Sequence, residues 1–214
     1  MARLLITVLF AVVFVAVLRI QAEDTNSLPK KFLRTKRAAL TSAQRDAFLD
    51  THNSYRGDTS PPAADMHKMV WNDDLAKMAQ AWSEKCVFAH GQPDGITSPF
   101  PHVGQNLYVA SGTVVAPPDG QVVSKYWHDE VAFFDFDDNE CSGVCGHYTQ
   151  EVWSDTTDLG CGWAFCPTVE NAFDNGWVVT CNYGPGGNYE GEKPYKAGEA
   201  CSACPGQCVD NECV

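Results

Sequence analysis

The sequence predicts a mixed α+β protein that is closed by disulfides. Three segments repeat apolar residues at the spacing of a helix that buries one face: 42–55, 73–90 and 120–134. Two strands are predicted after them, at about 159–166 and 176–183. All ten cysteines lie between Cys86 and Cys213, and their even number indicates that they pair.

The N-terminus is predicted to be removed in two steps. Residues 1–22 resemble a secretory signal peptide, because an apolar run too short for a comfortable membrane span follows Arg3 and Ala22 offers a small residue for cleavage. Residues 23–37 end in Arg-Thr-Lys-Arg, which suits a furin-like convertase, so we predict a propeptide and a mature chain that starts at Ala38. A solvated basic tail is the alternative for this segment. The protein is expected to be secreted and extracellular.

The predicted mature chain, 38–214, is strongly acidic. Residues 1–37 hold seven of the 15 basic residues and two of the 27 acidic residues, which leaves 8 basic and 25 acidic residues and a formal charge of −17. Such a chain repels phosphate groups, which argues against nucleic acid and against electrostatic docking on anionic membranes. Its length suffices for one domain with a core. No second long apolar stretch follows, so we do not expect an integral membrane protein.

The cysteines are expected to form disulfides. An even cysteine count behind a signal peptide is typical of folding in an oxidising compartment. Cys201 and Cys204 have the spacing of a zinc-thiolate pair, which is the competing interpretation. The segment from Cys201 to Cys213 has too few apolar residues for a core, so disulfides must hold it.

The first helix is predicted to start at a Thr41 or Ser42 cap. Its apolar face holds Phe48, Leu49, His52 and Tyr55. On this face His52 is expected to be a packing histidine rather than a catalyst. Asn53 and Arg56 are expected to fix neighbouring loops through hydrogen bonds.

The second helix is predicted to start at Asn72 or Asp73 and to end at Gly91. The residues that share its buried face are Leu75, Ala79, Trp82, Cys86 and His90. His90 would then lie at the C-terminal end of the helix, where the carbonyls favour an imidazolium or a bound metal. Residues 92–118 are expected to form a long loop over a cleft, interrupted by an extended segment at 105–110.

The third helix carries an acid on its apolar face. That face is predicted to hold Val122, Val123, Tyr126, Trp127, Val131 and Phe134. Glu130 lies among them, whereas Lys125, His128 and Asp129 are expected to point elsewhere. A carboxylate on a buried face is costly unless a cation or hydrogen-bond donors meet it, which makes Glu130 a site candidate. The alternative is a side chain at the edge of the face that reaches water.

Residues 146–153 read Gly-His-Tyr-Thr-Gln-Glu-Val-Trp and supply the other site candidate. Gly146 lets another segment or a ligand approach the backbone closely. His147 is a candidate metal ligand or acid–base group near neutral pH, and a core histidine held by hydrogen bonds is the alternative. The acidic loop at 135–140 lacks the glycine and the last glutamate of a calcium loop, so we expect it to be solvated. A turn is predicted at 174–176.

Four stretches follow one another in an order that is typical of one family. They are His52-Asn53-Ser54-Tyr55-Arg56, Gly104-Gln105-Asn106-Leu107, residues 146–153 and residues 179–189. Together they resemble the CAP superfamily of cysteine-rich secretory, antigen 5 and pathogenesis-related-1 proteins, from about residue 42 to the end. The segment from Cys141 to Cys145 is most similar to the glioma pathogenesis-related branch.

This resemblance implies a three-layer α-β-α sandwich with a central antiparallel sheet. The sandwich would cover residues 38–190, and a short disulfide-stapled extension would follow at 191–214. The resemblance also implies five disulfides: Cys86–Cys166, Cys161–Cys181, Cys141–Cys145, Cys201–Cys208 and Cys204–Cys213.

The resemblance further implies a cleft with two histidines and two acids. In this chain these positions fall on His90, Gln105, Glu130 and His147. Some family members bind zinc through the two histidines, so we expect His90 and His147 to bind zinc or another divalent cation weakly. Gln105 replaces the commoner glutamate, and an amide can neither act as a base nor supply charge.

Three functions are compatible with this resemblance. The first is a secreted binding or signalling protein with a metal-capable cleft, whose partner is an extracellular protein, a lipid or a sterol. The second is a secreted endopeptidase that uses Glu130 and His147, with His90, on a water molecule. The third is a venom-type channel modulator, which is expected less because such relatives carry a longer cysteine-rich C-terminal domain. We favour the first.

Overall fold

The computed structural model describes residues 39–115 and 117–214. The predicted signal peptide and propeptide, 1–37, lie outside the described residues. In chain order the elements are α1 (Ser42–Arg56), β1 (Val70–Trp71), α2 (Asp73–Ser83), β2 (Gly104–Ser111), α3 (Gly120–His128), the 3-10 helix η1 (Asp129–Phe133), β3 (Phe134–Asp135), β4 (Glu140–Cys141), α4 (Gly146–Glu151), β5 (Asp158–Thr168), β6 (Asp174–Gly184), β7 (Cys208–Val209) and β8 (Glu212–Cys213).

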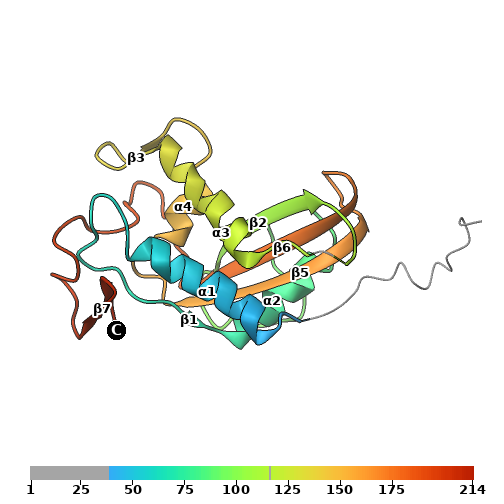
Figure 1. Cartoon of the computed structure of the whole chain (residues 1–214), viewed down its shortest axis with the longest axis horizontal. Helices are drawn as coiled ribbons and strands as arrows, with labels where there is room; N and C mark the ends of the chain where they lie inside the picture. Colours follow the sequence, from blue (N-terminus) through green and yellow to red (C-terminus); the bar gives the residue numbers. More distant parts are fainter. Residues whose placement is uncertain (1–38, 116) are drawn as a thin grey trace, which may run out of the picture. The chain divides into compact units, whose positions relative to one another are not determined.

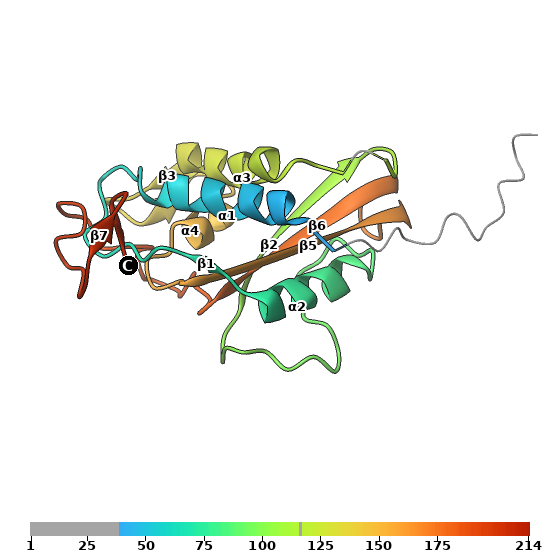
Figure 2. The same cartoon turned by 60° about the horizontal axis from the view of Figure 1, so that its bottom comes forward.

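The domain has the predicted three layers. Its central sheet has the strand order β1-β5-β6-β2, in which the pairs β5–β6 and β6–β2 are antiparallel and the short β1 is parallel to β5. Helices α1, α3 and α4 lie on one face of the sheet and α2 lies on the other (Figures 1 and 2). The sheet is therefore mixed at one edge, where the resemblance implied an antiparallel one.

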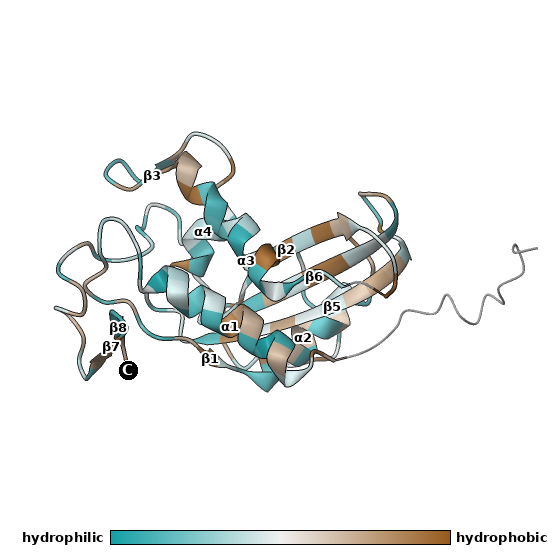
Figure 3. Ribbon diagram, in the orientation of Figure 1, coloured by the Kyte–Doolittle hydropathy of each residue, from teal (hydrophilic) through white to brown (hydrophobic). Residues whose placement is uncertain are grey.

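Side chains along β5 and β6 alternate between the two faces of the sheet, so both strands contribute to the core on each face. Successive strand residues point to opposite faces, so Trp163 and Val179 join the core under α1 and α3, while Ala164 and Val178 pack on the α2 side. Hydrophobic segments run along these strands in Figure 3. Gly160 faces α2 so closely that a Cβ there would collide with the helix backbone, so this close approach requires glycine.

The first helix forms as its sequence predicts. Thr41 caps it, with its hydroxyl accepting from the Gln44 backbone N–H while the Gln44 side chain accepts from the Thr41 backbone, a complete capping box. Phe48 and His52 are fully buried on its inner face. Asn53 holds the neighbouring loop as expected, because its side chain exchanges two hydrogen bonds with the Met69 backbone at 2.9 and 3.0 Å.

The prediction for the end of the second helix is wrong. Helix α2 stops at Ser83, so Cys86 and His90 do not extend its face. Cys86 has a φ of 59°, a left-handed conformation that no helix can continue, and its disulfide to Cys166 holds the turn. His90 is exposed on the loop that follows rather than at a helix terminus.

The third helical segment also departs from its prediction. Its last part tightens into the 3-10 helix η1, and its apolar face is only partly buried. Val123 and Trp127 are fully buried, whereas Val122 and Tyr126 are 58% and 61% exposed. His128, which was expected to point away, lies between α1 and α4, where it contacts Tyr55 and Glu151.

The turn between the two long strands lies earlier than predicted. Strand β6 already begins at Asp174, so residues 174–176 belong to the strand and pair with β5. The reversal uses residues 169–173, where Asn171 has a φ of 67° and the Val169 N–H donates to the Phe173 carbonyl at 2.8 Å. An asparagine tolerates this left-handed conformation, which explains the position of the turn.

The five disulfides join the pairs that the resemblance implied: Cys86–Cys166, Cys141–Cys145, Cys161–Cys181, Cys201–Cys208 and Cys204–Cys213. Two of them hold the small β7–β8 hairpin at the C-terminus, which rests on the domain where the Cys213 N–H donates to the Met66 carbonyl at 2.7 Å. Within residues 39–115 and 117–214, no helix has the length and apolarity needed to cross a membrane.

Candidate functional site

The short helix α4 carries His147, and Glu130 caps it from another element. No side chain of α4 itself caps its N-terminus. The Glu130 carboxylate on η1 accepts instead from the backbone N–H groups of His147 and Tyr148, at 3.0 and 3.4 Å. A carboxylate is favourable there because the first N–H groups of a helix are unpaired and carry partial positive charge.

The same carboxylate fixes the imidazole of His147. Nδ1 of His147 lies 2.6 Å from Oε1 of Glu130, so this nitrogen donates its hydrogen to the carboxylate. Within the described chain Nε2 makes no hydrogen bond, and the side chain is 23% exposed. Glu130 is thus met by three donors, as burial of a carboxylate requires.

His90 and Gln105 form a second hydrogen-bonded pair. Nδ1 of His90 lies 3.1 Å from Oε1 of Gln105, so it donates to the amide oxygen. The Gln105 amide also bonds to both backbone groups of Gly91, at 3.1 and 2.8 Å, and donates to Asn182 at 3.2 Å. Gln105 therefore ties the exposed His90 loop to β2.

Strand β2 connects the two pairs. The residue after Gln105 is Asn106, whose amide donates to the His147 carbonyl at 3.0 Å. A pocket of about 310 Å³ is lined by His90 and Gln105, and Asn188 on its rim holds the Gly146 carbonyl at 2.8 Å. The four predicted residues therefore form two hydrogen-bonded pairs, and the pocket is lined by His90 and Gln105 but not by Glu130 or His147. Among the described residues, no three His, Cys, Asp or Glu side chains are placed to hold a metal together.

Sequence reasoning missed His102, which lines the same pocket. Its Nε2 lies 3.3 Å from the Gly187 carbonyl, and its ring packs against Tyr189. The only signal in the sequence was its place two residues before Gly104, at the start of a stretch that was already singled out.

Beneath the cleft, α4 is held at its C-terminus by Arg56. Nη1 of this fully buried guanidinium donates to the carbonyls of Glu151 and Trp153, at 3.0 and 2.8 Å. Burial lowers the pKa of Arg56 to about 10, so it stays charged at neutral pH. A cation at this end complements the helix dipole, as the carboxylate does at the other end.

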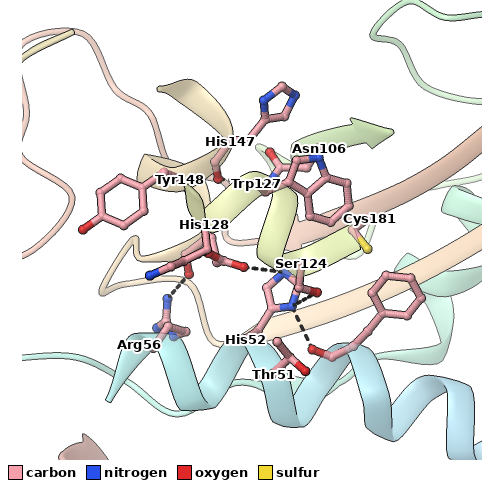
Figure 4. Close-up of polar contacts among 12 residues, drawn as sticks. Thr51, His52, Arg56, Asn106, Ser124, Trp127, His128, His147, Tyr148 and Cys181 are labelled. Atoms are coloured by element: carbon pink, nitrogen blue, oxygen red, sulfur yellow. Dashed lines mark hydrogen bonds and ion pairs between the residues drawn. The ribbon is translucent and has the colours of Figure 1, made fainter. Parts of the chain in front are cut away.

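His52 is the packing histidine that its position predicted. Its Nδ1 donates to the Phe48 carbonyl and its Nε2 accepts from the Tyr183 hydroxyl, both at 2.8 Å. Burial lowers the pKa of His52 to about 3, so the ring is neutral. Figure 4 shows the His147 ring turned away from His52, with Trp127 between them. His52 therefore takes no part in the cleft.

Glu151 is the buried acid that sequence reasoning missed. It is fully buried, its Oε2 lies 3.1 Å from Nδ1 of His128, and its Oε1 makes no hydrogen bond within the described chain. Burial raises the pKa of this carboxyl well above its usual range, and the nearby guanidinium of Arg56 only partly offsets this. Its helix neighbours Tyr148 and Val152, which are both buried, were the signal that could have placed it inward.

The chemistry open to the cleft follows from these bonds. The Glu130 carboxylate already accepts from three N–H groups, and the Gln105 side chain is an amide, which cannot act as a base. In a neutral histidine whose Nδ1 donates, as in these two contacts, Nε2 carries no hydrogen. Such a nitrogen is a ligand for a divalent cation.

Comparisons with known proteins agree with this architecture. The sequence profile of the cysteine-rich secretory protein family, CAP, matches residues 49–183. GLIPR1-like protein 1 of Mus musculus is 40% identical over 170 residues, which cover 78% of this chain and 70% of that protein. Peptidase inhibitor 16 of Mus musculus is 39% identical over 170 residues, which cover 78% of this chain and 32% of that protein. A solved structure described as NaASP2 with Zn2+ matches with a TM-score of 0.65 at 28% identity, over 82% of this chain and 97% of that one.

Proposed function

Because this chain belongs to the cysteine-rich secretory protein (CAP) family, we propose that it is a secreted binding protein whose cleft holds a divalent cation weakly. His90 and His147 would hold the ion through Nε2, with water in the remaining positions. We include in this proposal an extracellular partner, which is a lipid, a sterol or a protein.

One observation carries the metal part of this proposal. In both histidines Nδ1 donates to a side-chain oxygen, that of Gln105 for His90 and that of Glu130 for His147. A histidine that ligates a metal typically donates its other ring N–H to a carbonyl or carboxylate in this way, which fixes the tautomer and the ring orientation. The solved relative described with Zn2+ makes zinc the first ion to test.

Weak binding is expected from the donor set. A structural zinc site usually has four protein ligands, whereas here only two imidazoles are offered. Glu130 supplies a negative charge nearby, but its oxygens are engaged with the N–H groups of α4. Ligation requires neutral imidazoles, so binding should be present at pH 7.5 and lost at pH 5, where histidines protonate. Equilibrium dialysis of the mature protein against zinc at the two pH values tests this, and equal binding at both would exclude histidine ligation.

The endopeptidase alternative is disfavoured by the bonds of Glu130. A general base accepts a proton from water, and N–H groups already take three of about four acceptor positions of this carboxylate. The mature protein should therefore leave a peptide library intact, with zinc and with chelator. Cleavage that is lost in Glu130→Gln and in the presence of chelator would overturn the binding proposal in favour of a peptidase.

A further inference from the structure

Two carboxylate–histidine contacts join the same elements in opposite directions. On the cleft side, Glu130 of η1 binds His147 of α4 at 2.6 Å. On the buried side, His128 of α3 binds Glu151 of α4 at 3.1 Å. In the first contact α4 supplies the histidine, and in the second α4 supplies the acid. Because His128 and Glu130 are two residues apart and His147 and Glu151 are four apart, one short helix is held at both ends by one short segment.

The contact between His128 and Glu151 is largely enclosed by side chains of α1 and α4. The ring of His128 stacks on Tyr55 of α1, with 3.8 Å between the ring centroids and 8° between the planes. Oε1 of Glu151 lies 3.8 Å from Nε2 of His52, and Arg56 bonds to the Glu151 carbonyl. The side chain of His128 is 21% exposed and that of Glu151 is not exposed at all. The contact is therefore a fixed part of the packing between α1, α3 and α4.

Helix α4 depends on such contacts for its place. It has six residues, far fewer than a helix needs to be stable alone in water, so its orientation is set by what it packs against. His147 and Glu151 are one helical turn apart, which puts them on the same side of the helix. A rotation of α4 that breaks the contact at Glu151 must also displace His147 from Glu130.

We propose that His128 and Glu151 are positioning residues for the cleft, which hold α4 in the rotation that seats the His147 imidazole on Glu130. This inference rests on the proposed function where it concerns metal affinity. It stands apart from that function where it concerns the His147–Glu130 bond, which exists without any metal. Arg56 has a different role. It bonds to backbone carbonyls at the end of α4 and not to a side chain of that helix.

Two substitutions of Glu151 separate positioning from general stability. Glu151→Gln offers both an amide oxygen and an amide N–H, so it can bond to Nδ1 of His128 in either tautomer and should behave as wild type. Glu151→Leu removes that bond but also removes a buried carboxyl with an unbonded oxygen, so its melting temperature need not fall. His128→Phe keeps the stacking on Tyr55 and removes the bond from the other side. Val178→Ala, in the core on the far face of the sheet, is the control for a fold that is merely weakened.

The first readout is the NMR signal of the His147 Nδ1–H, whose exchange with water is slowed by its bond to Glu130. We expect the signal in wild type, Glu151→Gln and Val178→Ala, and its loss in Glu151→Leu and His128→Phe. The second readout is calorimetric zinc affinity, which should fall about tenfold in the same two variants, as is usual when an outer partner of a ligand is lost.

Retention of the Nδ1–H signal in Glu151→Leu, with zinc affinity within twofold of wild type, would overturn the inference. Loss of the signal in Val178→Ala would also overturn it, because any weakening of the fold would then suffice. If wild type binds no zinc, the proposed function fails and the NMR comparison alone decides the positioning role.

Discussion

Replacement of Arg56 by lysine tests how the cleft helix is anchored. The guanidinium is fully buried and donates to five backbone carbonyls, those of His67, Glu151, Trp153, Ser154 and Thr156. Lysine keeps the charge but offers three donors from one nitrogen, so at least two of these carbonyls lose their bond to residue 56. The carbonyls of His67, Glu151 and Thr156 lie apart and have no second backbone donor within the described chain, so one ammonium group is expected to leave some of them unpaired. A buried polar group left unpaired costs about 1–3 kcal/mol. We therefore expect Arg56→Lys to lower the free energy of unfolding by about 3 kcal/mol.

Urea unfolding with the disulfides intact, followed by tryptophan fluorescence, measures this free energy. Arg45→Lys is the matched control, because Arg45 is 40% exposed and pairs with the exposed Asp73 at 3.0 Å. An exposed pair of this kind contributes less than about 1 kcal/mol. If Arg56→Lys is no more destabilising than Arg45→Lys, then the hydrogen bonds of Arg56 do not anchor the loops and α4.

Further outcomes are expected from other residues. Burial raises the pKa of Glu212 from 4.5 to about 7, so the free energy of unfolding should fall as pH rises through this interval. Glu212→Gln should flatten the dependence of the melting temperature on pH there, and an unchanged slope would contradict this assignment. Burial lowers the pKa of His52 from 6.5 to about 3, so His52→Gln should reduce the loss of stability as pH falls through that interval, and an equal loss would show that His52 is not the cause. Gln105→Glu should tighten zinc binding in calorimetry because it adds a negative charge, and it should lower stability because the donors to Gly91 and Asn182 are lost. Zinc affinity equal to that of wild type would mean that Gln105 does not face the ion. Thiol labelling of the denatured, unreduced protein should find no free thiol, and N-terminal sequencing of the secreted protein should begin at Ala38; labelled cysteines or a start at residue 23 would contradict these.

The fold could be predicted where local chemistry and packing agree. The Thr41 cap, the buried face of α1 and the alternation of the two long strands all follow from residue type and spacing. The end of α2 could not be predicted, because its pattern continues to His90 while the disulfide at Cys86 stops the helix. The disulfide joins Cys86 to a strand that is distant in the sequence, so the helical spacing of apolar residues does not reveal where the helix ends.

The site could be predicted only as a set of residues. The resemblance implied that His90, Gln105, Glu130 and His147 share a cleft, but their grouping into two hydrogen-bonded pairs depends on contacts between elements that are distant in the sequence. The partnership of His128 with Glu151 was hidden for the same reason. Each of the two polar side chains looks solvent-facing in its own segment, and only the packing of α3 on α4 buries the contact between them.

The most direct test of the proposed cleft is a calorimetric zinc titration at neutral pH with single histidine variants. Wild type should bind one ion weakly, and His90→Ala and His147→Ala should each abolish binding, because two imidazoles are the protein ligands. His102→Ala should bind as wild type, although His102 lines the same pocket as His90. If His147→Ala binds zinc as wild type does, or if His102→Ala alone abolishes binding, the assignment of the metal to His90 and His147 is wrong.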